Sequence, residues 1–107
     1  MTQSSADVID KMIAAVHARN CSVLLDILSE DASLDDWGRR YTGREQIEAW
    51  LEKEIVDKGI AVTVMKTEAI GPDTVLTVLV HDGASTTSSH VAIKVTGEKI
   101  SDLTIRA

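Results

Sequence analysis

The hydrophobic residues of this chain repeat with a helical period up to about residue 59 and alternate from about residue 60 onward. Within residues 5–18 they recur at steps of three and four, which predicts an amphipathic helix. Asn20 or Ser22 is a suitable cap for a second, shorter helix. We expect the polar segment 29–33 to end that helix.

A strand and a longer helix are predicted next. The strand is expected at about residues 33–37. Thr42 and Glu45 have the spacing of a capping box, which predicts that a third helix begins there. The pair Lys58-Gly59 is a typical helix end, with a cation in the last turn and a glycine after it.

The second half of the chain predicts a series of antiparallel strands. Strands are expected at residues 60–70, 74–82, 86–96 and 99–106. Turn sequences separate them: GPDT at 71–74, DGAS at 82–85 and a tight TGEK hairpin at 96–99. The expected order is α-α-β-α-β-β-β-β, an α+β arrangement in a single domain of residues 1–107.

Composition narrows the choice of partners. The net charge of −6 argues against nucleic acid, because phosphate binding needs a basic surface. Cys21 is the only cysteine, so we expect a buried structural thiol and a reducing compartment. No apolar run could span a bilayer, and residues 1–10 lack the features of a signal peptide, so a cytoplasmic location is expected.

All three aromatic residues lie between Trp37 and Trp50, in the junction LDDWGRRYTGREQIEAWL at 34–51. Amphipathic rings beside two acids suit the rim and wall of a pocket. For Trp50 the favoured interpretation is core packing, whereas Trp37 and Tyr41 fit pocket lining and packing equally well.

The element order and the segment SEDASLDDWGRRYTGREQIEAWL resemble the nuclear transport factor 2-like superfamily, in particular its SnoaL-like and ketosteroid isomerase-like branch. The resemblance covers essentially the whole chain. It implies a cone-shaped, cystatin-like fold with three helices packed on a strongly curved antiparallel sheet, and an apolar pocket inside the cone. Members of this superfamily differ widely in function, so the resemblance is more specific for fold than for activity.

The same resemblance suggests where a reactive group would lie. The carboxylate that removes a proton in the isomerases falls on Asp36, whereas Asp35 points to the other side of the strand. The tyrosine that donates to the oxyanion would fall on Met12 and the protonated aspartate on Ser89. Steroid isomerisation is therefore not expected, because both strong donors are replaced.

The predicted site has one candidate catalytic residue, Asp36, and a mainly apolar lining. The cluster Arg39, Arg40 and Arg44 could clamp an anion, but a solvated loop is favoured. The three histidines lack metal-binding spacing, so neither a metal nor another cofactor is expected. His90 has the opposite strand parity to Ser89, so it is expected to face outward if Ser89 faces the pocket. The predicted lining residues are Met12, Val16, Trp37, Tyr41, Trp50, Ser89 and Val91.

Two functions remain open from the sequence. The first is binding of a small apolar molecule, with or without acid–base isomerase or hydrolase activity. The second is a non-catalytic dimerisation or interaction module whose pocket is filled by its own side chains. The strand 74–82 is apolar on both faces, so a homodimer through the outer sheet face is expected in either case.

Overall fold

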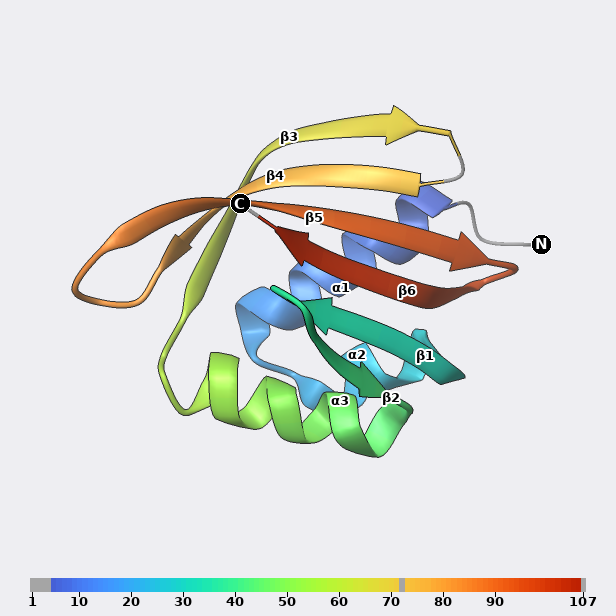
Figure 1. Cartoon of the computed structure of the whole chain (residues 1–107), viewed down its shortest axis with the longest axis horizontal. Coiled ribbons are helices and arrows are strands. Elements are labelled where there is room, and N and C mark those ends of the chain that lie inside the picture. The colour runs from blue at the N-terminus through green and yellow to red at the C-terminus, as the bar shows by residue number, and fades with distance from the viewer. Residues whose placement is uncertain (1–4, 72, 107) are drawn as a thin grey trace.

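A computed structural model describes residues 5–71 and 73–106 as an α+β fold (Figure 1). Its helices are α1 (Ser5–Ala18), α2 (Cys21–Asp26) and α3 (Arg44–Leu51), and α3 continues into a π-helical turn, η1 (Glu52–Val56). Its strands are β1 (Leu28–Asp36), β2 (Arg39–Thr42), β3 (Ala61–Ile70), β4 (Asp73–His81), β5 (Thr86–Thr96) and β6 (Lys99–Arg106).

The six strands form one mixed sheet in the order β2-β1-β6-β5-β4-β3. Four of the five strand pairs are antiparallel, and three of these, β3–β4, β4–β5 and β5–β6, form the predicted antiparallel series. The pair β1–β6 is parallel, which the sequence did not predict. The first strand joins the sheet beside the last one, so this pairing depends on contacts between the two ends of the chain.

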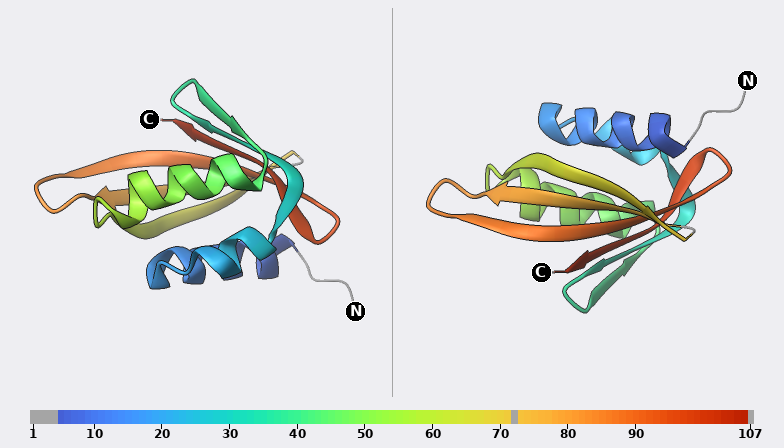
Figure 2. Two further views of the ribbon diagram at one scale, coloured as in Figure 1. Left: turned by 90° about the horizontal axis from the view of Figure 1, so that it is seen from below. Right: turned by 90° about the horizontal axis from the view of Figure 1, so that it is seen from above.

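The sheet is curved, and the three helices lie on its concave side (Figures 1 and 2). Helix α1 contacts β3 at one edge of the sheet, and α3 contacts β1 and β2 at the other. The helices therefore close the open side of the curved sheet, which gives the predicted cone.

The predicted stripe of α1 faces inward: Ile9 and Met12 are at most 8% exposed, and Ile13 and Val16 are partly buried. Val8 and Ala15, at most 4% exposed, widen this buried face. The side chain of Asn20 caps α2 by accepting a hydrogen bond from the amide of Val23 at 3.3 Å.

The strands alternate between the two faces of the sheet, as expected. On β4, Leu76 and Val78 are at most 2% exposed and face the helices. Val75 and Leu79 are half-buried on the outer face. Residue 72 of the predicted 71–74 turn lies outside the described residues.

The junction before α3 differs from the prediction in two ways. The polar segment 29–33 belongs to β1 and does not end a helix, and the unpredicted strand β2 follows it. The predicted capping box is wrong: Gly43 is the N-cap, with φ of +86°, and no side chain caps the helix. The side chain of Gln46 instead accepts from the amide of Thr42 at 2.8 Å, because Thr42 is held in β2.

Candidate ligand-binding site

A cavity of about 330 Å³ is lined by residues of the concave face of the sheet and of helices α1 and α3. Its wall is mainly aliphatic, and its volume is at the lower end of the range for small-molecule sites. The lining residues are Met12, Ile13, Val16, His17, Leu24, Leu34, Asp36, Trp37, Ile47, Trp50, Leu51, Glu54, Ile55, Ile60, Val62, Val64, Leu76, Val78, Val80, Thr87, Ser89, Val91, Leu103 and Ile105.

The cavity has a closed apolar floor and a more polar mouth. The floor includes Leu34, Ile47 and Leu76, each no more than 2% exposed. The exposed lining residues are His17, Trp37 and Thr87. A ligand would therefore meet aliphatic carbon inside and polar groups near the solvent.

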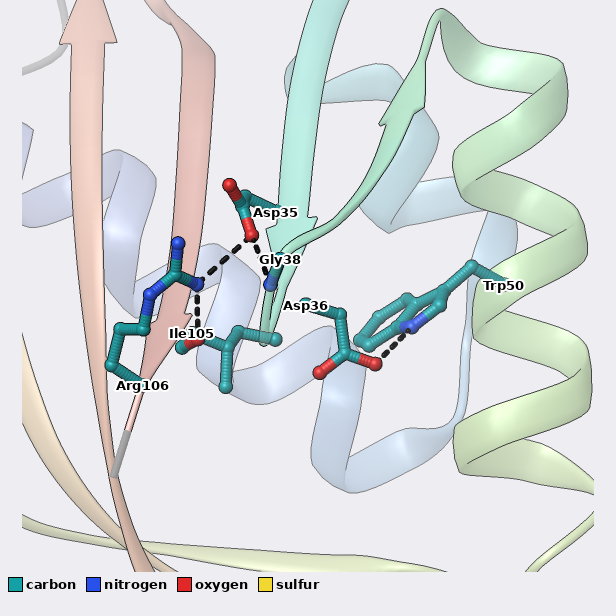
Figure 3. A network of polar contacts seen from close by, with 6 residues as sticks. All are labelled: Asp35, Asp36, Gly38, Trp50, Ile105 and Arg106. Carbon is teal, nitrogen blue, oxygen red and sulfur yellow. Dashed lines mark hydrogen bonds and ion pairs between the residues drawn. The ribbon is translucent and has the colours of Figure 1, made fainter.

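Asp36 is the predicted acid at the wall, and a hydrogen bond from Trp50 holds it in place (Figure 3). The indole Nε1–H of Trp50, on α3, donates to Oδ2 of Asp36 at 3.0 Å. The sheet register places Asp36 opposite Ile105 of β6, and Ile105 opposite Val91 of β5, so all three belong to one row across the concave face. No other hydrogen bond of the Asp36 side chain is formed within residues 5–71 and 73–106.

Asp35 points to the other side of the strand, as predicted (Figure 3). Its Oδ1 accepts from Arg106 at 2.9 Å and from the amide of Gly38 at 2.7 Å. The hydrogen bonds from Arg106 and from Gly38 hold the pKa of Asp35 below its usual value. The two adjacent acids therefore have separate surroundings, one at the cavity and one in an ion pair outside it.

Trp37 occupies a strained position at the mouth. It is the first of the two residues that join β1 to β2, with φ of +54°, and Gly38 follows with φ of +95°. Glycine and asparagine are favoured at such positions, and tryptophan is not. The ring lines the cavity although the residue is 57% exposed.

The structure places seven of the eight predicted residues on the cavity wall. Tyr41 is the exception: it is not among the residues that line the cavity, and it packs against Trp50 with ring centroids 6.4 Å apart. Trp50 lines the cavity and also packs against the core, so the two interpretations of its role are both partly right. The predicted residues on the wall are Met12, Val16, Asp36, Trp37, Trp50, Ser89 and Val91.

Three polar residues of the wall were missed by sequence reasoning. Thr87 has the same strand parity as Ser89 and could have been found from it. Glu54 follows Trp50 by four residues, and His17 follows Ile13 by four. Helical spacing therefore places each of them on the same face as a lining residue, and it could have predicted both.

Glu54 and His17 are each engaged by the protein. The carboxylate of Glu54 accepts from Lys58 at 2.6 Å, and this hydrogen bond holds the pKa of Glu54 below its usual value. Nε2 of His17 donates to the carbonyl of Val62 at 2.7 Å, which links α1 to β3.

The arginine cluster does not form a clamp in the cavity. The guanidinium of Arg44 donates to the carbonyl of Leu28 at 2.8 and 3.2 Å, which is a structural role. Arg39 and Arg40 are exposed on β2, and none of the three lines the cavity.

The remaining candidates lie away from the site. Nδ1 of His81 lies 2.9 Å from Oγ1 of Thr86, and His90 faces outward as its parity predicts. Cys21 is partly buried, and burial, followed by Glu52 and Glu48, raises the pKa of its thiol.

Two general features are absent from the part of the chain that the structure describes. No group of three or more histidine, cysteine, aspartate or glutamate side chains is placed to hold a metal ion. No described helix is both long and apolar enough to cross a membrane.

Comparison with known proteins identifies the fold but not the function. No protein-family model and no curated protein matches the sequence. A candidate polyketide cyclase from Sinorhizobium meliloti matches with a TM-score of 0.87 and 17% identity over 94% of both chains. A candidate ketosteroid isomerase from Kribbella flavida matches with a TM-score of 0.86 and 20% identity over 97% of this chain and 77% of its own.

A third match is a computationally designed 17-OHP binder, with a TM-score of 0.85 and 14% identity over 100% of this chain and 92% of its own. Proteins described as NTF2-like and as cystatin-fold also match. These likenesses confirm the predicted resemblance at the level of fold. The chain has the nuclear transport factor 2-like, cystatin-like cone fold of the SnoaL-like and ketosteroid isomerase-like proteins.

Proposed function

We propose that this protein binds a small, mainly apolar molecule inside the cone, with Asp36 as the polar group that orients it. The observation that carries the proposal is an open aliphatic cavity of about 330 Å³ with a carboxylate at its wall. A cavity that packs shut would leave no such volume, because protein interiors are filled to the density of organic crystals. The designed 17-OHP binder supports the proposal, since the same fold serves there to bind a small molecule.

We also propose a catalytic activity, in which Asp36 acts as a general base in an isomerisation or hydrolysis. Its Oδ2 is fixed by Trp50, so the carboxylate is held in position at the wall. The resemblance puts Met12 and Ser89, both on the cavity wall, where the isomerases carry oxyanion donors. A thioether donates no hydrogen bond and a single hydroxyl is a weak replacement, so any reaction here would be slower than steroid isomerisation.

Binding and proton abstraction can be tested with one neutral ketone, 2-tetralone. Trp37 and Trp50 are the only tryptophans and both line the cavity, so both indole N–H signals should shift during an NMR titration. In deuterium oxide, a base at Asp36 would remove an α-proton and return a deuteron, and the exchange would be read at the α-carbons.

The neighbouring acids provide the matched control. Asp36→Asn should abolish the exchange, whereas Asp35→Asn should retain it, because Asp35 lies on the other side of β1. Shifts of both indole signals without exchange would leave a binding protein and end the catalytic proposal. An absence of shifts for a wider set of ketones and epoxides would end the binding proposal.

The alternative, a non-catalytic interaction module with a filled pocket, has less support. It requires Met12 and the tryptophans to occupy the cavity, whereas these side chains line an open one. If the full-length protein binds another protein chain and no small molecule, the alternative is supported.

We further propose a homodimer through the outer sheet face, in a cytoplasmic setting. Val75 and Leu79 are only half-buried on that face, and the neighbouring edge strand β3 exposes Met65 and Ile70 at 60% and 54%. A second copy of the chain that packs on this face would bury these side chains. Light scattering should give twice the chain mass at tens of micromolar protein, and a monomeric mass would end this proposal.

A further inference from the structure

The cavity wall carries two carboxylates, and among the described residues only Glu54 of the two has an ion-pair partner. The titratable side chains of the wall are Asp36, Glu54 and His17, and no lysine or arginine is among the residues that line it. An anionic ligand would therefore meet like charge and no fixed counter-charge. The wall is better suited to a neutral or cationic ligand.

Asp36 is the carboxylate of the wall that has no ion-pair partner, although the charge of Arg106 also acts on it. Among the described residues its one hydrogen-bond partner is the indole of Trp50, which is neutral. Arg106 donates to Asp35 on the opposite side of the strand, as Figure 3 shows. Glu54, by contrast, is already paired with Lys58. A carboxylate in an apolar wall gains most from a partner that brings a positive charge.

The hydroxyl of Ser89, a largely buried residue, provides a second polar group on the same wall. Ser89 is 7% exposed and lines the cavity, and its hydroxyl forms no hydrogen bond with the part of the chain that the structure describes. It lies two residues before Val91 on β5, and Val91 shares its row with Asp36. Both side chains therefore face the same space from different strands, and an N–H donor of a ligand could use either oxygen.

The indole rings of Trp37 and Trp50 can also attract a cation in the cavity. Trp37 lines the mouth, and Trp50 lines the wall beside Asp36. Trp50 uses its N–H for Asp36 and packs against Tyr41, and its side chain also lines the cavity. Tryptophan faces attract alkylammonium groups, and the attraction grows when water is excluded.

We propose that the ligand of this cavity is a monocationic amine with an apolar body. The ammonium group lies against Asp36, the hydrocarbon body fills the aliphatic floor, and Ser89 and the two indoles line the same space. The inference rests on the binding part of the proposed function. It does not rest on the acid–base part, because Asp36 serves as a counter-ion in this complex.

A matched series of adamantane compounds separates charge from shape. The three probes are 1-adamantylamine, neutral 1-hydroxyadamantane and 1-adamantanecarboxylate, at about pH 8, where an ordinary imidazole is neutral and an alkylamine is cationic. The dissociation constants would be measured on the full chain from the indole N–H signals of Trp37 and Trp50. We expect the amine to bind at least about tenfold more tightly than the alcohol, and the carboxylate to bind most weakly.

Substitutions tie this preference to the wall. Asp36→Asn should remove the preference for the amine over the alcohol, whereas Asp35→Asn should keep it. If Asp36→Asn does not fold, Ser89→Ala provides the second test and should weaken amine binding by severalfold. Equal or tighter binding of the alcohol or the carboxylate would overturn the amine proposal and leave small-molecule binding intact. Failure of all three probes to bind would overturn both.

Discussion

The indole Nε1–H of Trp50 donates to Oδ2 of Asp36 at 3.0 Å, and this bond joins α3 to the last residue of β1 at the cavity wall. The bond fixes the carboxylate that we assign to the ligand. It also links a helix to the curved sheet, so it should contribute to both binding and stability.

Trp50→Phe should lower the free energy of unfolding by about 1–2 kcal/mol, because a charged acceptor loses its donor while most of the ring volume remains. Urea unfolding measures the change. Tyr41→Phe is the control, because Tyr41 packs against Trp50 and its hydroxyl forms no hydrogen bond with described residues. Equal losses in the two variants would mean that the bond to Asp36 contributes nothing.

Trp37→Asn should stabilise the protein by about 1 kcal/mol, because asparagine tolerates the left-handed backbone conformation that Trp37 adopts. The same change should weaken 2-tetralone binding, since the ring lines the mouth. Arg19→Asn is the matched control: Arg19 also has φ of +54° but does not line the cavity. Tighter binding by the Trp37 variant would show that the ring obstructs the site.

Asp35 should make stability depend on pH in the acid range. Its pKa is lower in the folded than in the unfolded chain, through the hydrogen bonds from Arg106 and Gly38. The stabilisation is therefore fully present above the unfolded pKa of about 3.9 and is lost as the pH falls through the lower folded pKa.

Melting temperatures of wild type and Asp35→Asn over this range test that prediction. The difference between the two proteins should be largest near neutral pH and should shrink below about pH 4. A difference that is constant with pH would show that Asp35 contributes no proton-linked stability.

Val91→Phe should fill part of the cavity and abolish 2-tetralone binding, at a stability cost of about 1 kcal/mol or less because the added carbon enters open space. Ala92→Phe is the control, because it adds an even larger group at the next residue, which faces the outer side of the sheet. The affinity of each chain for 2-tetralone should stay unchanged in this variant. Retained binding in the Val91 variant would place the ligand elsewhere.

Sequence reasoning predicted this fold well where one local pattern dominates. The stripe through Met12 predicted the inner face of α1, and the parity of β5 separated Ser89 from His90. It failed where distant segments decide the outcome. The strand β2 is short and charged, and the parallel pairing of β1 with β6 joins segments about 70 residues apart, so neither leaves a periodic signal.

Sequence reasoning found those site residues that a resemblance or a local cluster marks, and it missed what depends on three-dimensional packing. Asp36 and the aromatic residues could be proposed from the resemblance and from their clustering. Tyr41 was misplaced because the short strand β2 turns it toward Trp50. Whether aliphatic side chains line a space or fill it depends on their three-dimensional packing, which a hydrophobic pattern does not encode.

Xenon is the most direct probe of the central claim, because it enters apolar cavities without needing any polar contact. Under xenon pressure, the methyl NMR signals of Leu76, Val78 and Val91, which line the cavity, should shift with a saturable dependence. Those of Val75 and Leu79, neighbours on the outer face of β4, should not. Saturable shifts confined to the inner set would establish an open cavity inside the cone. An absence of shifts in that set would mean that the cone is filled by its own side chains and that the small-molecule account is wrong.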